Sequence, residues 1–107
     1  MSNITSMVLI TGPGEEDAVA ELNAWCREHD ADCHQEFRRL DPDAAGGMKV
    51  LTVDVWAMAG NYFPWTDLVN ALGEFEWHWP EDVVLVVDHE PTNQHAVFRV
   101  GDRVDQT

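Results

Sequence analysis

The chain has 107 residues, of which 45% are hydrophobic, and this predicts a single globular domain over residues 1–107. Twenty acidic residues against six lysines and arginines give a formal net charge of −14. This charge argues against direct binding to nucleic acid and against anionic membrane surfaces, because both need clustered bases.

The N-terminal third predicts a strand followed by a helix. Residues 7–11 are an apolar run that ends at Gly12-Pro13-Gly14, as in a buried strand with a sharp exit. Apolar side chains then recur at helical spacing over residues 15–29, which predicts a helix. Three acids follow the glycine turn and the spacing is not that of a phosphate loop, so no nucleotide cofactor is expected.

Two strands are predicted next, over residues 33–41 and 49–59. In the second strand, one face carries Asp54, Trp56 and Met58. Because that face mixes polar and apolar side chains, it is expected to be the open face of the sheet, only partly covered. Gly60-Asn61 is expected to break this strand.

The remaining elements are a helix that starts near Pro64 and ends at Gly73, a strand over 83–88 and a hairpin partner over 95–100. Residues 1–6 and 101–107 are expected to fray. The order resembles the ferredoxin-like (split βαβ) plan. We therefore predict an α+β two-layer sandwich, with a mainly antiparallel sheet of four to six strands and two helices on one face. The first strand and residues 83–88 are expected at its centre.

Residues 74–82, EFEWHWPED, alternate acids with aromatic residues. A short strand would place Phe75, Trp77 and Trp79 on one face. Most of the chain's aromatic residues lie between residues 56 and 79, and a core of this size cannot easily bury them all. We therefore predict a partner-binding surface here, because aromatic anchors with a polar rim are typical of interfaces. Its residues are Tyr62, Phe63, Trp65, Asp67, Glu74, Glu76, Trp77, His78, Trp79, Glu81 and Asp82.

The favoured function is a non-enzymatic interaction protein that engages or inhibits a basic partner, including one that normally binds nucleic acid. Small acidic inhibitors, some of them encoded by phages, have a similar composition. Two alternatives stay open. One is a ligand- or metal-binding dimeric domain, or an enzyme, that uses the open sheet face around Trp56 and Met58, which also offers a homodimer surface. The other is an acidic domain of a halophilic or high-GC organism whose charge has no specific partner.

No catalytic, cofactor-binding or metal-binding residue is predicted. Cys26, His29, Cys33 and His34 could supply zinc ligands, but Cys33 and His34 are adjacent and would point to opposite faces of a strand. His89, Glu90 and His95 flank the last hairpin and are expected to form only its polar end. With no signal peptide and no long apolar segment, a reduced cytoplasmic protein is expected.

Overall fold

The computed structural model describes residues 4–29, 36–40, 53–61, 63–92 and 94–104, with only the backbone for Asn61 and Gln94. Its strands are β1 (Ile4–Thr11), β2 (Arg38–Arg39), β3 (Asp54–Asn61), β4 (Val84–His89) and β5 (Gln94–Arg99). The helices are α1 (Glu16–His29) and α2 (Trp65–Ala71). Three short 3₁₀ helices follow α2, namely η2 (Leu72–Glu74), η3 (Pro80–Asp82) and η4 (Glu90–Thr92).

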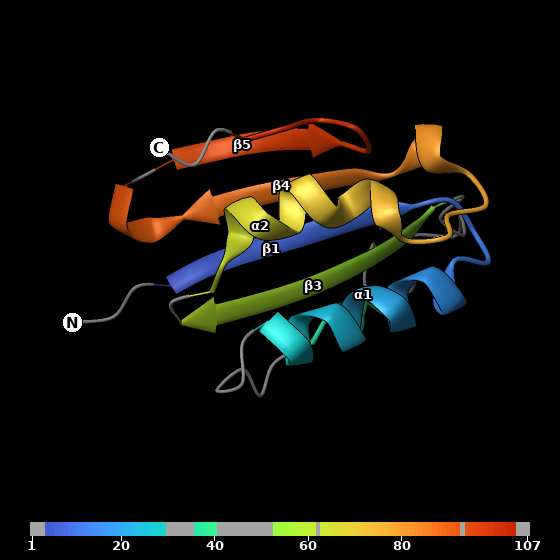
Figure 1. Ribbon diagram of the computed structural model, residues 1–107, viewed down its shortest axis with the longest axis horizontal. Coiled ribbons are helices and arrows are strands. Elements are labelled where there is room, and N and C mark those ends of the chain that lie inside the picture. The colour runs from blue at the N-terminus through green and yellow to red at the C-terminus, as the bar shows by residue number, and fades with distance from the viewer. Residues whose placement is uncertain (1–3, 30–35, 41–52, 62, 93, 105–107) are drawn as a thin grey trace, which may run out of the picture.

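The strands form one sheet in the order β2-β3-β1-β4-β5, and neighbouring strands are antiparallel throughout. Both helices lie on the same side of this sheet (Figure 1). The predicted two-layer sandwich with the split βαβ plan is therefore confirmed, and β5 extends the sheet beyond β4. The two most apolar strands, β1 and β4, lie inside the sheet as predicted, because a strand covered by helices needs apolar side chains.

The core lies between the sheet and the helices. In β1 every second side chain is buried, from Thr5 to Thr11. On α1 the buried stripe runs through Val19, Leu22 and Cys26, as the helical spacing predicted. The two buried threonines have polar partners: the Oγ1 of Thr5 lies 2.8 Å from His89 Nδ1, and that of Thr11 accepts a 3.2 Å hydrogen bond from Trp56 Nε1. Their burial therefore leaves no hydroxyl unsatisfied.

The predicted orientation of β3 was wrong. Trp56 and Met58 belong to the core, with exposed fractions of 7% and 6%, so they do not lie on the open face. Asp54 shares their face and is also buried, because Arg39 on β2 donates a 2.8 Å hydrogen bond to its carboxylate. The open face of the sheet instead carries smaller apolar side chains such as Val55 and Ala57, which are only partly buried.

Other predicted boundaries also changed. Gly60-Asn61 does not break β3, because the strand continues to Asn61. A Cβ on Gly60 would lie 3.0 Å from the Cβ of Phe63, so a glycine at this position leaves room for the buried side chain of Phe63. Gly73 does not end the second helix sharply, because α2 passes into η2. Of the predicted strand 33–41, the described residues form strand only at β2, and residues 33–35, 41 and 49–52 lie outside the described residues.

Two asparagines attach neighbouring segments to the helices. Asn23 of α1 bonds both backbone groups of Phe37, with its Oδ1 2.8 Å from the amide nitrogen and its Nδ2 3.2 Å from the carbonyl. Asn70 of α2 binds Val104 in the same way, at 2.7 and 3.1 Å. Of the segments expected to fray, residues 4–6 belong to β1 and Val104 is bonded to Asn70, whereas residues 1–3 and 105–107 lie outside the described residues. No helix in the described part of the chain is long and apolar enough to cross a membrane.

Candidate functional site

The acidic and aromatic segment 74–82 is held by one buried carboxylate. Glu15 ends the turn between β1 and α1 and has no exposed surface. Its carboxylate accepts hydrogen bonds from the backbone amides of His78 and Trp79, at 2.9 and 3.1 Å. A hydrogen bond to a charged acceptor is stronger than one between neutral groups. Glu15 therefore fixes the path of a segment more than sixty residues away.

The same turn contacts the ring of Trp79. A Cβ added to Gly12 would lie 3.3 Å from Trp79 Cδ1, so the indole lies directly over the glycine. Glu21 of α1 approaches the segment as well, with its Oε1 3.4 Å from the amide nitrogen of Glu76. Gly12, Glu15 and Glu21 were not among the predicted site residues, because no local pattern links them to residues 76–79.

Residues 74–82 do not form the short strand that their alternation predicted. The amide of Trp77 donates to the carbonyl of Phe75, and that of Asp82 donates to the carbonyl of Trp79, which are turn contacts. The three rings consequently differ in burial. Phe75 belongs to the core, Trp77 is half-buried with its Nε1 donating to the carbonyl of Leu72 at 2.8 Å, and Trp79 is 50% exposed.

The predicted site residues therefore separate into groups. Six of them lie exposed in one segment, which we call the acidic–aromatic surface: Glu74, Glu76, His78, Trp79, Glu81 and Asp82. Phe63 is buried, and Trp65 is half-buried against Phe98 and His89, with ring centroids 6.0 and 5.6 Å away. Trp77 is partly buried and packs against the core. Tyr62 lies outside the described residues. The structure thus keeps the acids together but assigns most of the aromatic rings to packing.

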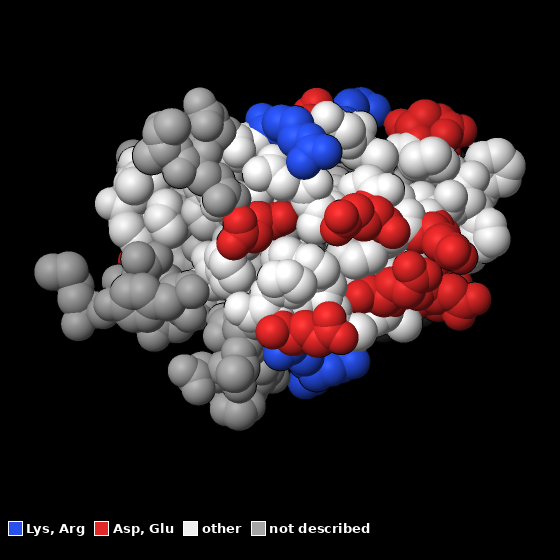
Figure 2. Space-filling view, viewed as in Figure 1, with Lys and Arg blue, Asp and Glu red and all other residues white. Residues whose placement is uncertain are grey.

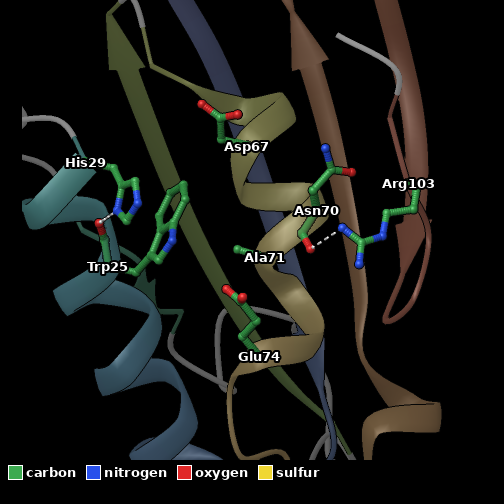
Figure 3. Close-up of a pocket in the computed structure, with 7 residues that line it drawn as sticks. All are labelled: Trp25, His29, Asp67, Asn70, Ala71, Glu74 and Arg103. Atoms are coloured by element: carbon green, nitrogen blue, oxygen red, sulfur yellow. Dashed lines mark hydrogen bonds between the residues drawn. The ribbon is translucent and has the colours of Figure 1, made fainter.

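Asp67 lies in a shallow groove of about 400 Å³ between the two helices (Figure 3). Its lining residues are Trp25, His29, Asp67, Asn70, Ala71, Glu74 and Arg103. Glu74 belongs to both the groove and the acidic–aromatic surface, so the two are continuous.

One wall of this groove is aromatic. Trp25 and His29 stack with ring centroids 4.0 Å apart, and His29 Nδ1 lies 2.9 Å from the carbonyl oxygen of Trp25. Because a carbonyl can only accept, this nitrogen carries the proton and donates. On the α2 side, Asp67 and Glu74 lie one turn either side of Ala71 (Figure 3). An indole beside two carboxylates suits a cationic side chain.

Acidic side chains are concentrated on the helix side of the molecule, where Figure 2 shows them as patches across the middle and right of this face, with basic side chains at its upper and lower edges. Along α1, α2 and residues 72–82 the exposed acids are Glu16, Asp17, Glu21, Glu28, Asp67, Glu74, Glu76, Glu81 and Asp82. The base on these elements is Arg27. On these elements nine exposed acids face one arginine, so a positively charged partner approaching from this side meets a predominantly negative field.

The residues that sequence spacing offered as metal ligands do not converge. Cys26 is buried in the core, whereas His29 is exposed and hydrogen bonded to its own helix. His89 faces the helices through Thr5, and His95 lies on the opposite face of the sheet beside Asp88. Within the described residues, no three histidine, cysteine or carboxylate side chains are grouped as a metal site. Cys33 and His34 fall outside the described ranges.

Comparisons of this chain with protein-family models, curated proteins and solved structures found no match. Its function is therefore inferred from the contacts and charges of its own residues.

Proposed function

We propose that this protein is a non-enzymatic interaction module that binds a basic protein through the acidic–aromatic surface and the adjoining groove. The observation that carries the proposal is Trp79, whose indole is half-exposed, whose ring lies close to Gly12 and whose backbone amide is bonded to the buried carboxylate of Glu15. A large apolar ring that is fixed in position loses little entropy on binding, so it is suited to anchor a partner.

The surrounding charges support a basic partner. Glu74, Glu76, Glu81 and Asp82 are exposed in the same segment as Trp79. Carboxylates at the rim of an interface attract a cationic partner over long distances and raise its association rate, particularly at low salt. The groove adds the carboxylates of Asp67 and Glu74 beside an indole, against one arginine, Arg103, so its lining also favours a lysine or arginine side chain of the partner.

The partner can be captured with matched baits. Wild-type protein and Trp79→Ala, which has the same net charge, are each immobilised. Both are exposed to lysate of the native host at about 50 mM and about 500 mM salt. A specific partner is retained by the wild type at low salt, is released at high salt, and is lost from Trp79→Ala. Proteins bound equally by both baits report only the net charge. If no protein distinguishes wild type from Trp79→Ala, the proposal is wrong.

Removing the anchor is expected to change dissociation. With the captured partner purified, Trp79→Ala should dissociate about 30-fold faster or more, because truncating a hot-spot tryptophan costs about 2 kcal/mol or more. Surface plasmon resonance measures both rates, and the cooperative thermal transition of the variant shows that the fold is retained. An unchanged dissociation rate would remove Trp79 from the interface.

Removing the rim charges is expected to change association instead. Glu74, Glu76 and Glu81 replaced together by glutamine should slow association about tenfold at low salt and flatten its salt dependence. The matched control replaces three exposed acids outside residues 74–82 by glutamine, namely Glu28, Glu36 and Glu90. It changes the net charge by the same amount. If both triple variants associate at the same rate, the effect belongs to the total charge and the acids around Trp79 have no special role.

A further inference from the structure

The open face of the sheet has a continuous apolar centre. Strand register places Ala57, Val8, Val86 and Val97 side by side across β3, β1, β4 and β5. The next row contains Val55, Ile10 and Val84. Val97 is 63% exposed, and the other side chains of both rows are partly buried, as expected for side chains that stand on an uncovered sheet face.

This face also differs in charge from the helix side. Among the described strand residues, the acid that the register places here is Asp88, which pairs with His95 at a distance of 3.3 Å. Arg38 and Arg99 stand on the same face, opposite Ala57 and Val84. The open face is therefore apolar with a slight excess of positive charge, on a chain whose formal net charge is −14.

We propose that a second copy of this chain covers the open face, forming a two-fold symmetric dimer with the two sheets face to face. Apolar rows of this kind are self-complementary, as a two-fold interface requires. A two-fold axis along β1 places β2 of one copy over β5 of the other. Arg38 shares the row of Ala57 on the edge strand β2, so it lies over Val97 on the edge strand β5 of the other copy, where its long side chain can keep the guanidinium in water.

The charge distribution selects this face over the helix side. Packed sheets lie about 10 Å apart, and each is followed outward by a helix layer about 10 Å thick. The acidic helix sides of the two copies are then about 30 Å apart, several times the ~8 Å screening length at physiological salt. Contact through the helices would instead bring two acidic surfaces together, which like-charge repulsion opposes.

The size of the face is sufficient for a dimer. With strands ~4.8 Å apart and ~3.3 Å of rise per residue, the four long strands span about 440 Å² of flat area per copy. The two copies together give about 880 Å² of flat area, and side-chain relief raises the accessible area above this, towards the ~1,000 Å² expected of a specific interface. This area is small enough that dissociation should be measurable at micromolar protein concentrations.

Sedimentation equilibrium across the micromolar range tests the dimer directly. The wild type is expected at twice its chain mass of 12.1 kDa, and added salt should strengthen the association because it screens two negative copies. Val86→Lys, which places a charge at the centre of the face, should weaken association at least tenfold. If Val86→Lys loses its cooperative thermal transition, Val97→Lys replaces it in the test, because Val97 is more exposed and a lysine there should not unfold the protein. Ala20→Lys on the exposed side of α1 adds the same charge and should remain dimeric.

A wild type that stays monomeric at about 200 µM would overturn the proposal. So would a dimer that survives both lysine substitutions, since it would use another surface, such as the free edge of β5. The partner-binding proposal is tested separately: Trp79→Ala should remain dimeric, and salt should weaken partner binding while it strengthens the dimer.

Discussion

Replacing Glu15 with alanine is expected to destabilise the protein by about 2–4 kcal/mol and to release residues 76–79 from α1. The buried carboxylate accepts two backbone amides, and each amide would lose a charged partner. For a domain of this size such a loss lowers the melting temperature by more than about 10 °C. Urea denaturation measures the free energy, and hydrogen exchange should show lost protection at the amides of His78 and Trp79.

Two controls separate this contact from general effects of charge. Glu15→Gln keeps one acceptor oxygen, so its loss of stability should fall between those of wild type and Glu15→Ala. Glu16→Ala removes a neighbouring exposed acid and should cost less than about 1 kcal/mol. If Glu15→Ala is as stable as Glu16→Ala, the carboxylate does not hold the segment and does not pre-position Trp79.

Replacing Trp56 with alanine is expected to cost about 3–5 kcal/mol, the range observed for large aromatic side chains removed from a core. Trp56 is 7% exposed and lies between Leu9 of β1 and Arg39 of β2 in the sheet register. Its removal also leaves the buried hydroxyl of Thr11 without the indole donor. Chemical denaturation should show a lower midpoint, with folding retained at low temperature.

Neighbouring positions on β3 provide the comparison. Trp56→Phe keeps most of the ring but loses the hydrogen bond, so about 1–2 kcal/mol is expected. Val55→Thr alters the adjacent side chain on the open face and should change stability by less than about 1 kcal/mol in the monomer. A larger loss for Val55→Thr than for Trp56→Ala would mean that the two faces of β3 have been exchanged.

Much of the fold follows from local patterns. The spacing of Val19, Leu22 and Cys26 predicts helix α1, and a nearly unbroken run of valines predicts the interior position of β4. These signals depend on burial of apolar surface, which is the main driving force of folding and repeats with the period of each element.

The orientation of β3 could not be predicted in the same way. Both of its faces carry apolar residues, and Asp54 suggested that its face was exposed. The decisive contact is with Arg39 on the neighbouring strand, which makes burial of that carboxylate tolerable. Such a partner is identified only when the strands are paired.

The candidate site was predicted only in part, because it too depends on a contact between residues that are distant in the sequence. Its acids and Trp79 were found because they are crowded into one segment, but alternation alone suggested a strand. The contacts that replace the strand come from Glu15 and from a turn at Pro80. Since no periodicity connects residue 15 with residues 78 and 79, the sequence contains no local signal for the element that positions the indole.

The contact of Glu15 and Gly12 with Trp79 also has a consequence for inheritance. A larger residue at position 12 would displace the indole, and loss of the carboxylate at position 15 would release the backbone beneath it. We therefore expect selection to act on the three positions as a unit, whereas single exchanges of the exposed acids should cost little stability. In diverged homologues we expect positions 12, 15 and 79 to covary, and this covariation should persist after overall identity has faded.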